Sequence, residues 1–265
     1  MAVLNALRRT PAALRRNPVV LVPILVILLV QVPQLILQAV NPLLSSVVSL
    51  GLSLGFLVVL PVFQGGLIAM ADEALDGRTS LQTFVDEGKA NYVPFLVAYL
   101  ALVAVSSVLG MVTVLAALFG GLFVIGSGGL DSANIAVLAG IGLIVAVVVL
   151  LYFLALFFIQ FYGQAIVLED TGAVDGIKRS VSVVREHLVS TFGYTVLVGL
   201  FGGVFGGVVG VFPLLLSPRA PTTLPLPELS LSIVGLGGLI VLAVGTLFGG
   251  FFGVYSVSFY RELTT

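Results

Sequence analysis

The stretch EDTGAVDGIKRSVSVVREH, residues Glu169–His187, is a charged ribbon in a chain that carries little charge elsewhere. Its apolar residues recur at a spacing that alternates three and four, which predicts one apolar stripe along a helix. The stripe consists of Val174, Ile177, Val181, Val184 and Leu188, and the other faces carry Lys178, Arg179, Ser182, Arg185 and Glu186. Such a helix is too polar to cross lipid. It either lies in the membrane interface with its stripe toward the acyl chains, or packs that stripe against the protein's own bundle.

The composition around this ribbon excludes a water-soluble fold. Of the 265 residues, 59% are hydrophobic and 9% are charged, whereas soluble domains carry about 25% charged residues. The net charge of −1 gives no reason to expect a nucleic-acid partner. Because the chain has no cysteine, disulfides, thiol catalysis and cysteine-ligated metals are excluded together.

Six apolar runs are long enough to cross a bilayer, which takes about 20 residues per helix. They cover residues 18–40, 43–71, 91–125, 135–168, 188–216 and 231–260. The first run is too long for a secretory signal and no A-x-A cleavage site follows it, so we expect it to be retained. The sequence therefore predicts an all-α integral membrane protein with six transmembrane helices, short cytoplasmic amphipathic helices and a single polytopic domain over residues 1–265.

Charge fixes the expected orientation of these helices. Ten of the eleven basic residues fall on one side of the predicted membrane: Arg8, Arg9, Arg15, Arg16, Arg78, Lys89, Lys178, Arg179, Arg185 and Arg261. Only Arg219 falls on the other side. The positive-inside rule then predicts a multi-pass protein of the cell membrane with both termini in the cytoplasm.

The three charged segments that precede the odd-numbered runs look like copies of one another. Asn17, Asn91 and His187 are each the last polar residue before a run, and Arg15, Lys89 and Arg185 stand two positions earlier. This pattern predicts a threefold parallel repeat of an amphipathic helix plus a helical hairpin, with units 1–71, 72–168 and 169–265. The alternative is convergence of short, apolar, low-complexity sequence.

Polar residues inside the predicted spans are amides rather than charges. Ionisable groups within the membrane mark ion and proton pathways, and their absence from the middle of these runs argues against a proton-coupled pump or an ion channel. The amides that could line a polar path are Gln31, Gln34, Gln38, Gln64, Gln160 and Gln164. Hydrogen bonding between helices is the alternative explanation for them.

Glycines at a spacing of four give a packing signal in the last two runs. The set is Gly199, Gly203, Gly207, Gly245, Gly249 and Gly253. Small residues at this spacing let helix backbones approach closely, so we expect the fifth and sixth spans to pack on each other through them. A glycine-lined groove for lipid is the alternative.

No pattern of residues indicates catalysis. The chain lacks the nucleophile, zinc-site, phosphate-loop and dinucleotide motifs. His187, the single histidine, is a poor metal site on its own and is better explained by a role at the start of a helix. Pairs such as Glu169 and Asp170 are expected to be solvated helix ends that pair with Arg78, Lys178 or Arg179, with a surface cation site as the alternative. We expect no enzyme activity, catalytic residue, cofactor or metal.

Three segments carry a resemblance to a known family: RRNP at 15–18, EALDGRTSLQTFVDEGKANY at 73–92 and IVLEDTGAVDGIKRSVSVVREHLVSTFGY at 166–194. They resemble uncharacterised six-span membrane proteins of halophilic archaea, which are similar to the membrane domain fused to some bacterial glycerophosphodiester phosphodiesterases. The resemblance implies the membrane topology and an association with lipid metabolism or transport. It does not imply hydrolysis, because the catalytic domain of such fusions is a separate segment rich in His and Glu, and this sequence contains no such segment.

Together these observations predict a membrane scaffold or lipid-interacting module. A permease for a neutral or lipidic solute is the second hypothesis, and a lipid-modifying enzyme is the third. The expected partners are membrane lipids and other membrane proteins or a second copy of the chain.

Overall fold

The computed structural model describes residues 2–40, 42–126, 135–216 and 231–265, and these residues form helices without any strand. The elements in the first half are α1 (Ala2–Arg16), a short 3-10 turn (Pro18–Val20), α2 (Leu21–Val40), α3 (Pro42–Asp76), α4 (Leu81–Ala90) and α5 (Tyr92–Gly126). Those in the second half are α6 (Ile135–Ile159), α7 (Tyr162–Leu168), α8 (Ala173–Glu186), α9 (Leu188–Leu216) and α10 (Leu231–Thr264). Arg219 lies outside the described residues.

The long helices confirm the predicted all-α membrane fold. Five of them are long and apolar enough to cross a membrane, and a sixth is added if α1 and α2, which meet at a bend of 94°, form one bent span. In each of the five, at most 22% of the most apolar stretch is buried inside the chain. Most of their surface is therefore left to face lipid or another protein.

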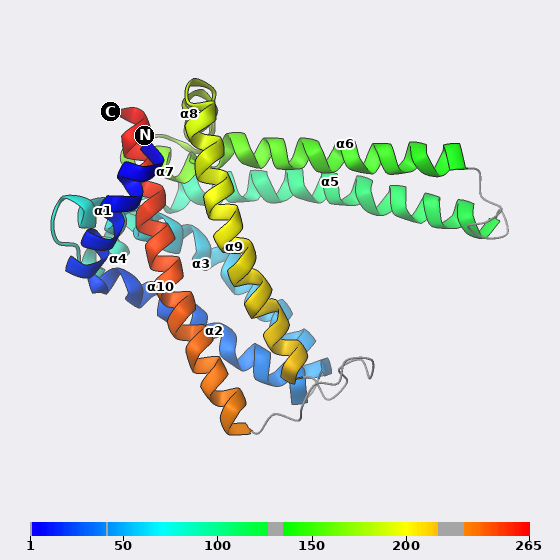
Figure 1. The fold of residues 1–265 in the computed structure, drawn as a ribbon, viewed down its shortest axis with the longest axis horizontal. Helices are drawn as coiled ribbons and strands as arrows, with labels where there is room; N and C mark the ends of the chain where they lie inside the picture. Colours follow the sequence, from blue (N-terminus) through cyan, green and yellow to red (C-terminus); the bar gives the residue numbers. More distant parts are fainter. Residues whose placement is uncertain (1, 41, 127–134, 217–230) are drawn as a thin grey trace.

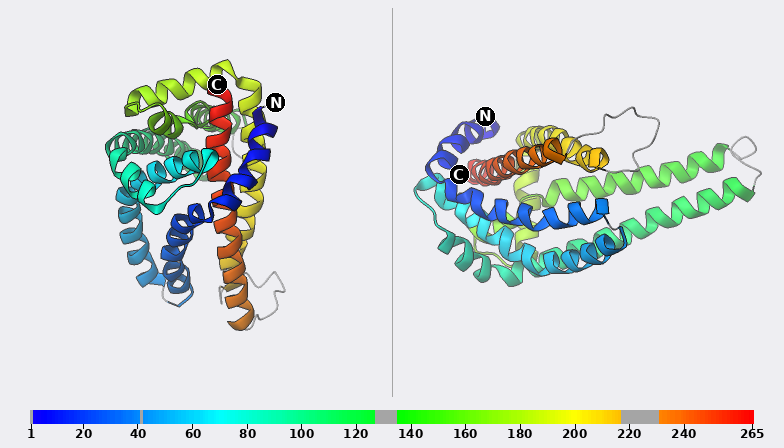
Figure 2. Two further views of the ribbon diagram at one scale, coloured as in Figure 1. Left: turned by 90° about the vertical axis from the view of Figure 1, so that its left-hand side faces the viewer. Right: turned by 90° about the horizontal axis from the view of Figure 1, so that it is seen from below.

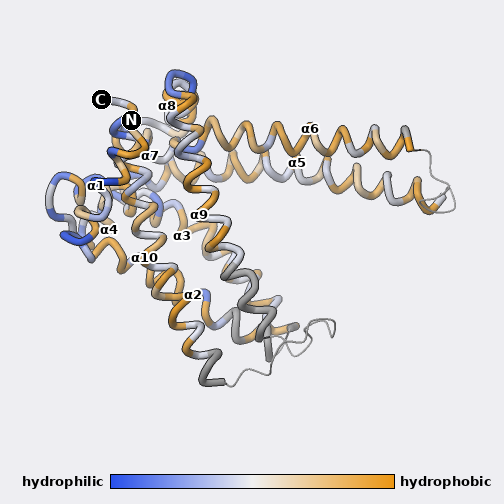
Figure 3. Tube along the Cα trace, viewed as in Figure 1, coloured by the Kyte–Doolittle hydropathy of each residue, from blue (hydrophilic) through white to orange (hydrophobic). Residues whose placement is uncertain are grey.

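The helices form two groups that share one end. Helices α2, α3, α9 and α10 run together, whereas the α5–α6 hairpin projects in another direction, as Figures 1 and 2 show from three sides. Both termini lie at the shared end, where α1, α4, α7, α8 and the last turns of α10 also lie, and we call this end the junction. The hydrophilic segments gather there as well, while the long helices beyond it are hydrophobic (Figure 3).

An aromatic cluster forms the largest part of the core at the junction. The ring of Tyr194 stacks on that of Phe259 with 4.5 Å between centroids, and Phe161 contacts both rings. Such pairs stabilise by about 0.5–1.5 kcal/mol beyond the area that they bury. Val183 and Val184 of α8 join this cluster and are at most 2% exposed.

The packing of α8 distinguishes between the two alternatives for its apolar stripe. Val184 is buried in the core, and Ile177 and Val181 are half-buried. Lys178 and Arg185 point to the exposed side. The middle of the stripe thus packs against the protein's own bundle, whereas its two ends, Val174 and Leu188, are 60% and 47% exposed.

The three short amphipathic helices each pack on the junction end of another helix. Helix α4 contacts α3, α8 contacts α7, and α1 contacts α10, the last helix described. The backbone N–H at Asn17, Asn91 and His187 donates to the carbonyl four residues earlier. In each case a side-chain nitrogen lies 3.0–3.2 Å from the same carbonyl oxygen. The threefold repeat stays a prediction, and matched helix ends are what it would produce.

The glycines of α9 do not pack as the sequence predicts. A methyl group added at Gly199, Gly203 or Gly207 would meet no atom within 4 Å, so the prediction that they hold α9 against α10 is wrong. Helix α9 instead reaches α10 through the bulky Phe205, whose ring stacks on Phe248 at 5.0 Å. A spacing of four marks a face of small residues, but it does not identify the helix that covers that face.

The glycines of α10 do lie at close contacts, mostly with other helices. A methyl group at Gly249 would lie 3.0 Å from Ile24 of α2, and one at Gly253 would lie 3.6 Å from Leu67 of α3. At Gly245 it would lie 3.0 Å from the Phe205 ring. The neighbours are therefore large side chains, and α10 packs on α1, α2 and α3 more than on α9.

Candidate functional site

A break in the fourth span lies at the centre of the junction. Helix α6 ends at Ile159 and α7 begins at Tyr162. The buried hydroxyl of Ser180, on α8, donates to the carbonyl of Phe158 at 2.9 Å and accepts from the backbone N–H of Phe161 at 3.0 Å. A side chain that inserts into the helical hydrogen-bond ladder in this way is a recognised cause of a break. At membrane depth such irregular backbone occurs where it is buried in protein or lines a cavity.

A pocket of about 230 Å³ lies beside this break. Its polar lining consists of Gln64, Gln160, Tyr162, Gln164 and Ser256. These residues come from α3, from the break and α7, and from α10, and Phe95 of α5 adds an aromatic wall. We call this space the amide pocket, because three of the six glutamines singled out in the sequence line it.

Hydrogen bonds across the amide pocket join its helices. The Tyr162 hydroxyl donates to Oε1 of Gln64 at 3.2 Å, which links α7 to α3. The Gln164 amide donates from Nε2 to Oγ of Ser256 at 3.3 Å, which links α7 to α10. Ser256 donates its own proton to the carbonyl of Gly253 at 2.8 Å.

The side-chain amide of Gln160 contacts other groups of the protein. Its Nε2 donates to the carbonyl of Phe157 at 2.8 Å. Its Oε1 lies 3.1 Å from the hydroxyl of Thr195 on α9, which also lies 2.9 Å from the Thr191 carbonyl and donates its one proton to one of the two. Gln160 therefore fixes the end of α6 against α9. The free hydrogen-bonding capacity of the amide pocket resides in Gln64 and Gln164.

Among the described residues, no glutamine of the first predicted span lines the amide pocket. Gln31 is exposed on α2 and lines none of the four pockets described. The side chains of Gln34 and Gln38 lie outside the described residues. The predicted polar path is thus represented by its three members near the junction.

A second, apolar hollow lies between α2, α3 and α4, and we call it the α2–α3 groove. It measures about 530 Å³, and its lining is apolar throughout, with Phe63 and Phe84 among the larger side chains. Gly51 and Gly55 form part of its wall, and a methyl group added at either would meet no atom within 4 Å. The groove is therefore open along these glycines.

Basic residues adjoin the loop that leads into the groove-lining residue Leu81. Asn17 accepts from the backbone N–H of Thr79 at 3.0 Å and donates to the carbonyl of Gly77 at 2.9 Å. These two bonds hold Arg78 beside the end of α1, where Arg15 and Arg16 precede Asn17. The same loop leads directly into Leu81, which lines the groove.

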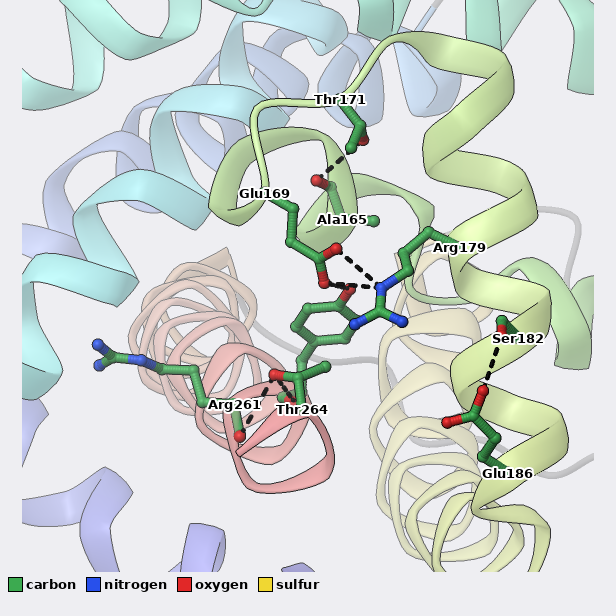
Figure 4. Close-up of polar contacts among 9 residues, drawn as sticks. Ala165, Glu169, Thr171, Arg179, Ser182, Glu186, Arg261 and Thr264 are labelled. Atoms are coloured by element: carbon green, nitrogen blue, oxygen red, sulfur yellow. Dashed lines mark hydrogen bonds and ion pairs between the residues drawn. The ribbon is translucent and has the colours of Figure 1, made fainter.

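An ionic contact ties the loop after α7 to two other helices. The Glu169 carboxylate accepts from Nε of Arg179 at 2.8 Å and from the Tyr260 hydroxyl at 2.6 Å (Figure 4). The bond to Glu169 raises the pKa of the Arg179 guanidinium above its ordinary value. The pairing of Glu169 with Arg179 was one of the sequence-based options, whereas Asp72 pairs with the distant Arg261 at 3.3 Å.

Sequence reasoning missed Ser180 and Tyr260. A serine on a polar helix and a tyrosine near the end of a span give no signal of their own, because both are common there as solvated groups. His187 caps the end of α8 through the contact of its Nδ1 with the Val183 carbonyl at 3.2 Å. Among the described residues, no group of three or more His, Cys, Asp or Glu residues could hold a metal ion.

The comparison with protein families gives one match, which covers residues 1–263. The matching model is described as a domain of unknown function, DUF7847. Curated proteins and solved structures give no match.

Proposed function

The chain belongs to the DUF7847 family, and on its own geometry we propose that it is a lipid-binding membrane scaffold without enzyme activity. In this proposal both termini lie in the cytoplasm, and the junction lies at that face of the cell membrane. The single observation that carries it is the α2–α3 groove, an apolar hollow of about 530 Å³. The other partners it would assemble with are membrane proteins or a second copy of the chain.

The chemistry of the groove selects the occupant. The lining side chains offer no hydrogen bond and no charge, so a polar ligand would lose its hydration without compensation. An acyl chain can fill the groove without that loss, because the bilayer interior that it leaves is as apolar as the lining side chains. Because the groove follows two predicted membrane spans, an acyl chain of a membrane phospholipid is the ligand that fits it.

The basic residues near the groove favour an anionic headgroup. Arg78 stands between Gly77 and Thr79, the two residues that Asn17 bonds, and Arg15 and Arg16 directly precede Asn17. A basic residue close to an anionic membrane surface contributes about 1 kcal/mol of attraction. We therefore propose an anionic phospholipid whose acyl chain lies in the α2–α3 groove and whose headgroup faces these arginines.

The test fills the groove without disturbing the protein's own packing. Gly55→Leu places a side chain in space where a methyl group would meet no atom within 4 Å. Gly110→Leu on α5 is the matched control, because it is equally open but does not line the groove. The measurement is the anionic phospholipid that stays bound per protein after detergent washing, determined by mass spectrometry.

The proposal expects Gly55→Leu to retain several-fold less anionic phospholipid than both the wild type and Gly110→Leu. Equal retention by all three proteins would show that the lipid is a general annulus around the helices. That result would contradict specific lipid binding in the α2–α3 groove, which is the main support for a lipid-binding function.

A permease for a neutral solute is the second candidate, and the amide pocket is the observation that favours it. Gln160 and Gln164 lie at the interruption between α6 and α7, Gln64 lies on α3, and interrupted spans form binding sites in many transporters. Uptake of labelled neutral solutes into vesicles that contain the protein would separate a permease from a scaffold.

The resemblance to six-span proteins of halophilic archaea and to the phosphodiesterase-fused membrane domain belongs to the scaffold proposal. The link to lipid metabolism that this resemblance implies agrees with lipid binding in the α2–α3 groove.

A further inference from the structure

Two side-chain atoms of the amide pocket, one on Gln164 and one on Gln64, have no hydrogen-bond partner among the described residues. Ser256 gives its single proton to the Gly253 carbonyl, so it can only accept from Gln164. This fixes Nε2 of Gln164 as the donor and leaves its Oε1 as the group without a partner among the described residues. Gln164 is 7% exposed, so the unused oxygen belongs to a side chain that is more than nine-tenths buried.

Gln64 presents the complementary group. Its Oε1 accepts from the Tyr162 hydroxyl, and its Nε2 has no partner within the described chain. Gln64 is half-buried, so the cost of about 1–3 kcal/mol for a buried polar group without a hydrogen bond is an upper limit for this nitrogen. The amide pocket is thus prepared to satisfy a ligand that donates to Gln164 and accepts from Gln64.

The size of the pocket and its lack of charged side chains further restrict the class of ligand that it can bind. About 230 Å³ holds several waters at about 30 Å³ each, or one small organic molecule. No ionisable Asp, Glu, Lys, Arg or His lines it, so an ion would be desolvated without a counter-charge. The rings of Phe95 and Tyr162, 6.0 Å apart, give an apolar wall on one side.

We propose that the amide pocket is a binding site for a small uncharged molecule with adjacent donor and acceptor groups, of the primary amide class. The amide group of such a ligand donates from its nitrogen to Oε1 of Gln164 and accepts at its oxygen from Nε2 of Gln64. Its apolar part lies toward Phe95. The site shares no lining residue with the α2–α3 groove, so either can fail without the other.

Acetamide is the probe, and acetate is its charged counterpart of the same shape. Binding is measured by saturation-transfer difference NMR on the full chain in detergent micelles. Gln164→Leu removes the acceptor, and Gln64→Leu removes the free donor. Gln82→Leu, at an exposed position on α4, is the matched control because it removes an amide outside the pocket.

The expected result is saturable binding of acetamide to the wild type and to Gln82→Leu, with little binding of acetate. Each pocket variant should weaken acetamide binding at least fivefold. Because Gln164→Leu also loses the bond to Ser256, Gln64→Leu decides the matter if Gln164→Leu melts early. The proposal is overturned if the wild type shows no saturable acetamide signal, if acetate binds equally well, or if a folded pocket variant binds like the control.

Discussion

The junction and the α5–α6 hairpin use the same apolar residue types in opposite ways. At the junction, Phe161 and Phe259 are at most 1% exposed and their rings lie in one aromatic cluster. On the hairpin, Phe119 and Phe153 are 66% and 62% exposed. In lipid, no hydrophobic force drives helices together, because the acyl chains are as apolar as the side chains.

The junction therefore depends on contacts that the hairpin lacks. It contains the helix break filled by Ser180, the bonds from Asn17 to the loop before α4, and the carboxylate of Glu169 between two donors. Close backbone contacts are also found there, since a methyl group at Gly66 would lie 2.2 Å from the Phe84 carbonyl oxygen. The comparison shows that specific packing is concentrated at the junction, where the hydrophilic segments also gather.

The largest effect is expected where two helix backbones touch. Gly66→Ala would force α4 away from α3, since the added methyl group overlaps the carbonyl of Phe84. We expect a loss of about 3 kcal/mol, at the upper end of the usual cost of overpacking. Unfolding in denaturant measures it, and Gly51→Ala on the same helix is the control because it meets no atom within 4 Å. Equal stability of the two variants would contradict the close contact.

An intermediate effect is expected at Asn17. Asn17→Ala removes the bonds to Gly77 and Thr79 and leaves partly buried backbone groups without partners. We expect about 2 kcal/mol of destabilisation and faster cleavage by trypsin at Arg78. Asn91→Ala is the comparison, because the Asn91 side chain bonds Glu87, four residues earlier in α4. If Asn91→Ala were the more damaging change, the role given to Asn17 would be wrong.

The smallest effect is expected on α9. Gly203→Leu adds a side chain where a methyl group would meet nothing within 4 Å, so thermal stability in detergent should stay within about 0.5 kcal/mol of the wild type. A melting temperature far below that of the wild type would show that α9 packs on another helix or on a second copy of the chain. It would also restore the packing role that the glycine spacing predicts.

The sequence was sufficient for the elements because each rests on a local property. Apolar length predicts the spans, and the alternation of Ile177, Val181 and Val184 predicts the buried stripe of α8. Which helices meet is a different kind of question. Gly203 and Gly249 have the same spacing pattern, yet only Gly249 lies against another helix. With little charge and no hydrophobic force in lipid, the pattern on one helix does not identify its neighbour.

The candidate sites were predicted in part for the same reason. Gln64, Gln160 and Gln164 stood out as amides in apolar runs, and the structure brings them together. Ser180, which maintains the break beside them, did not stand out. Arg261 bonds Asp76 across 185 positions of the chain, a pairing that no local pattern specifies.

Photolabelling of the reconstituted wild-type protein tests the contrast between the junction and the hairpin most directly. A membrane-soluble diazirine reacts with side chains that face lipid, and mass spectrometry locates the labels. We predict strong labelling at Phe119 and Phe153 and none at Phe161 and Phe259. Labelled Phe161 and Phe259 together with a protected hairpin would contradict the packed junction and the open hairpin alike.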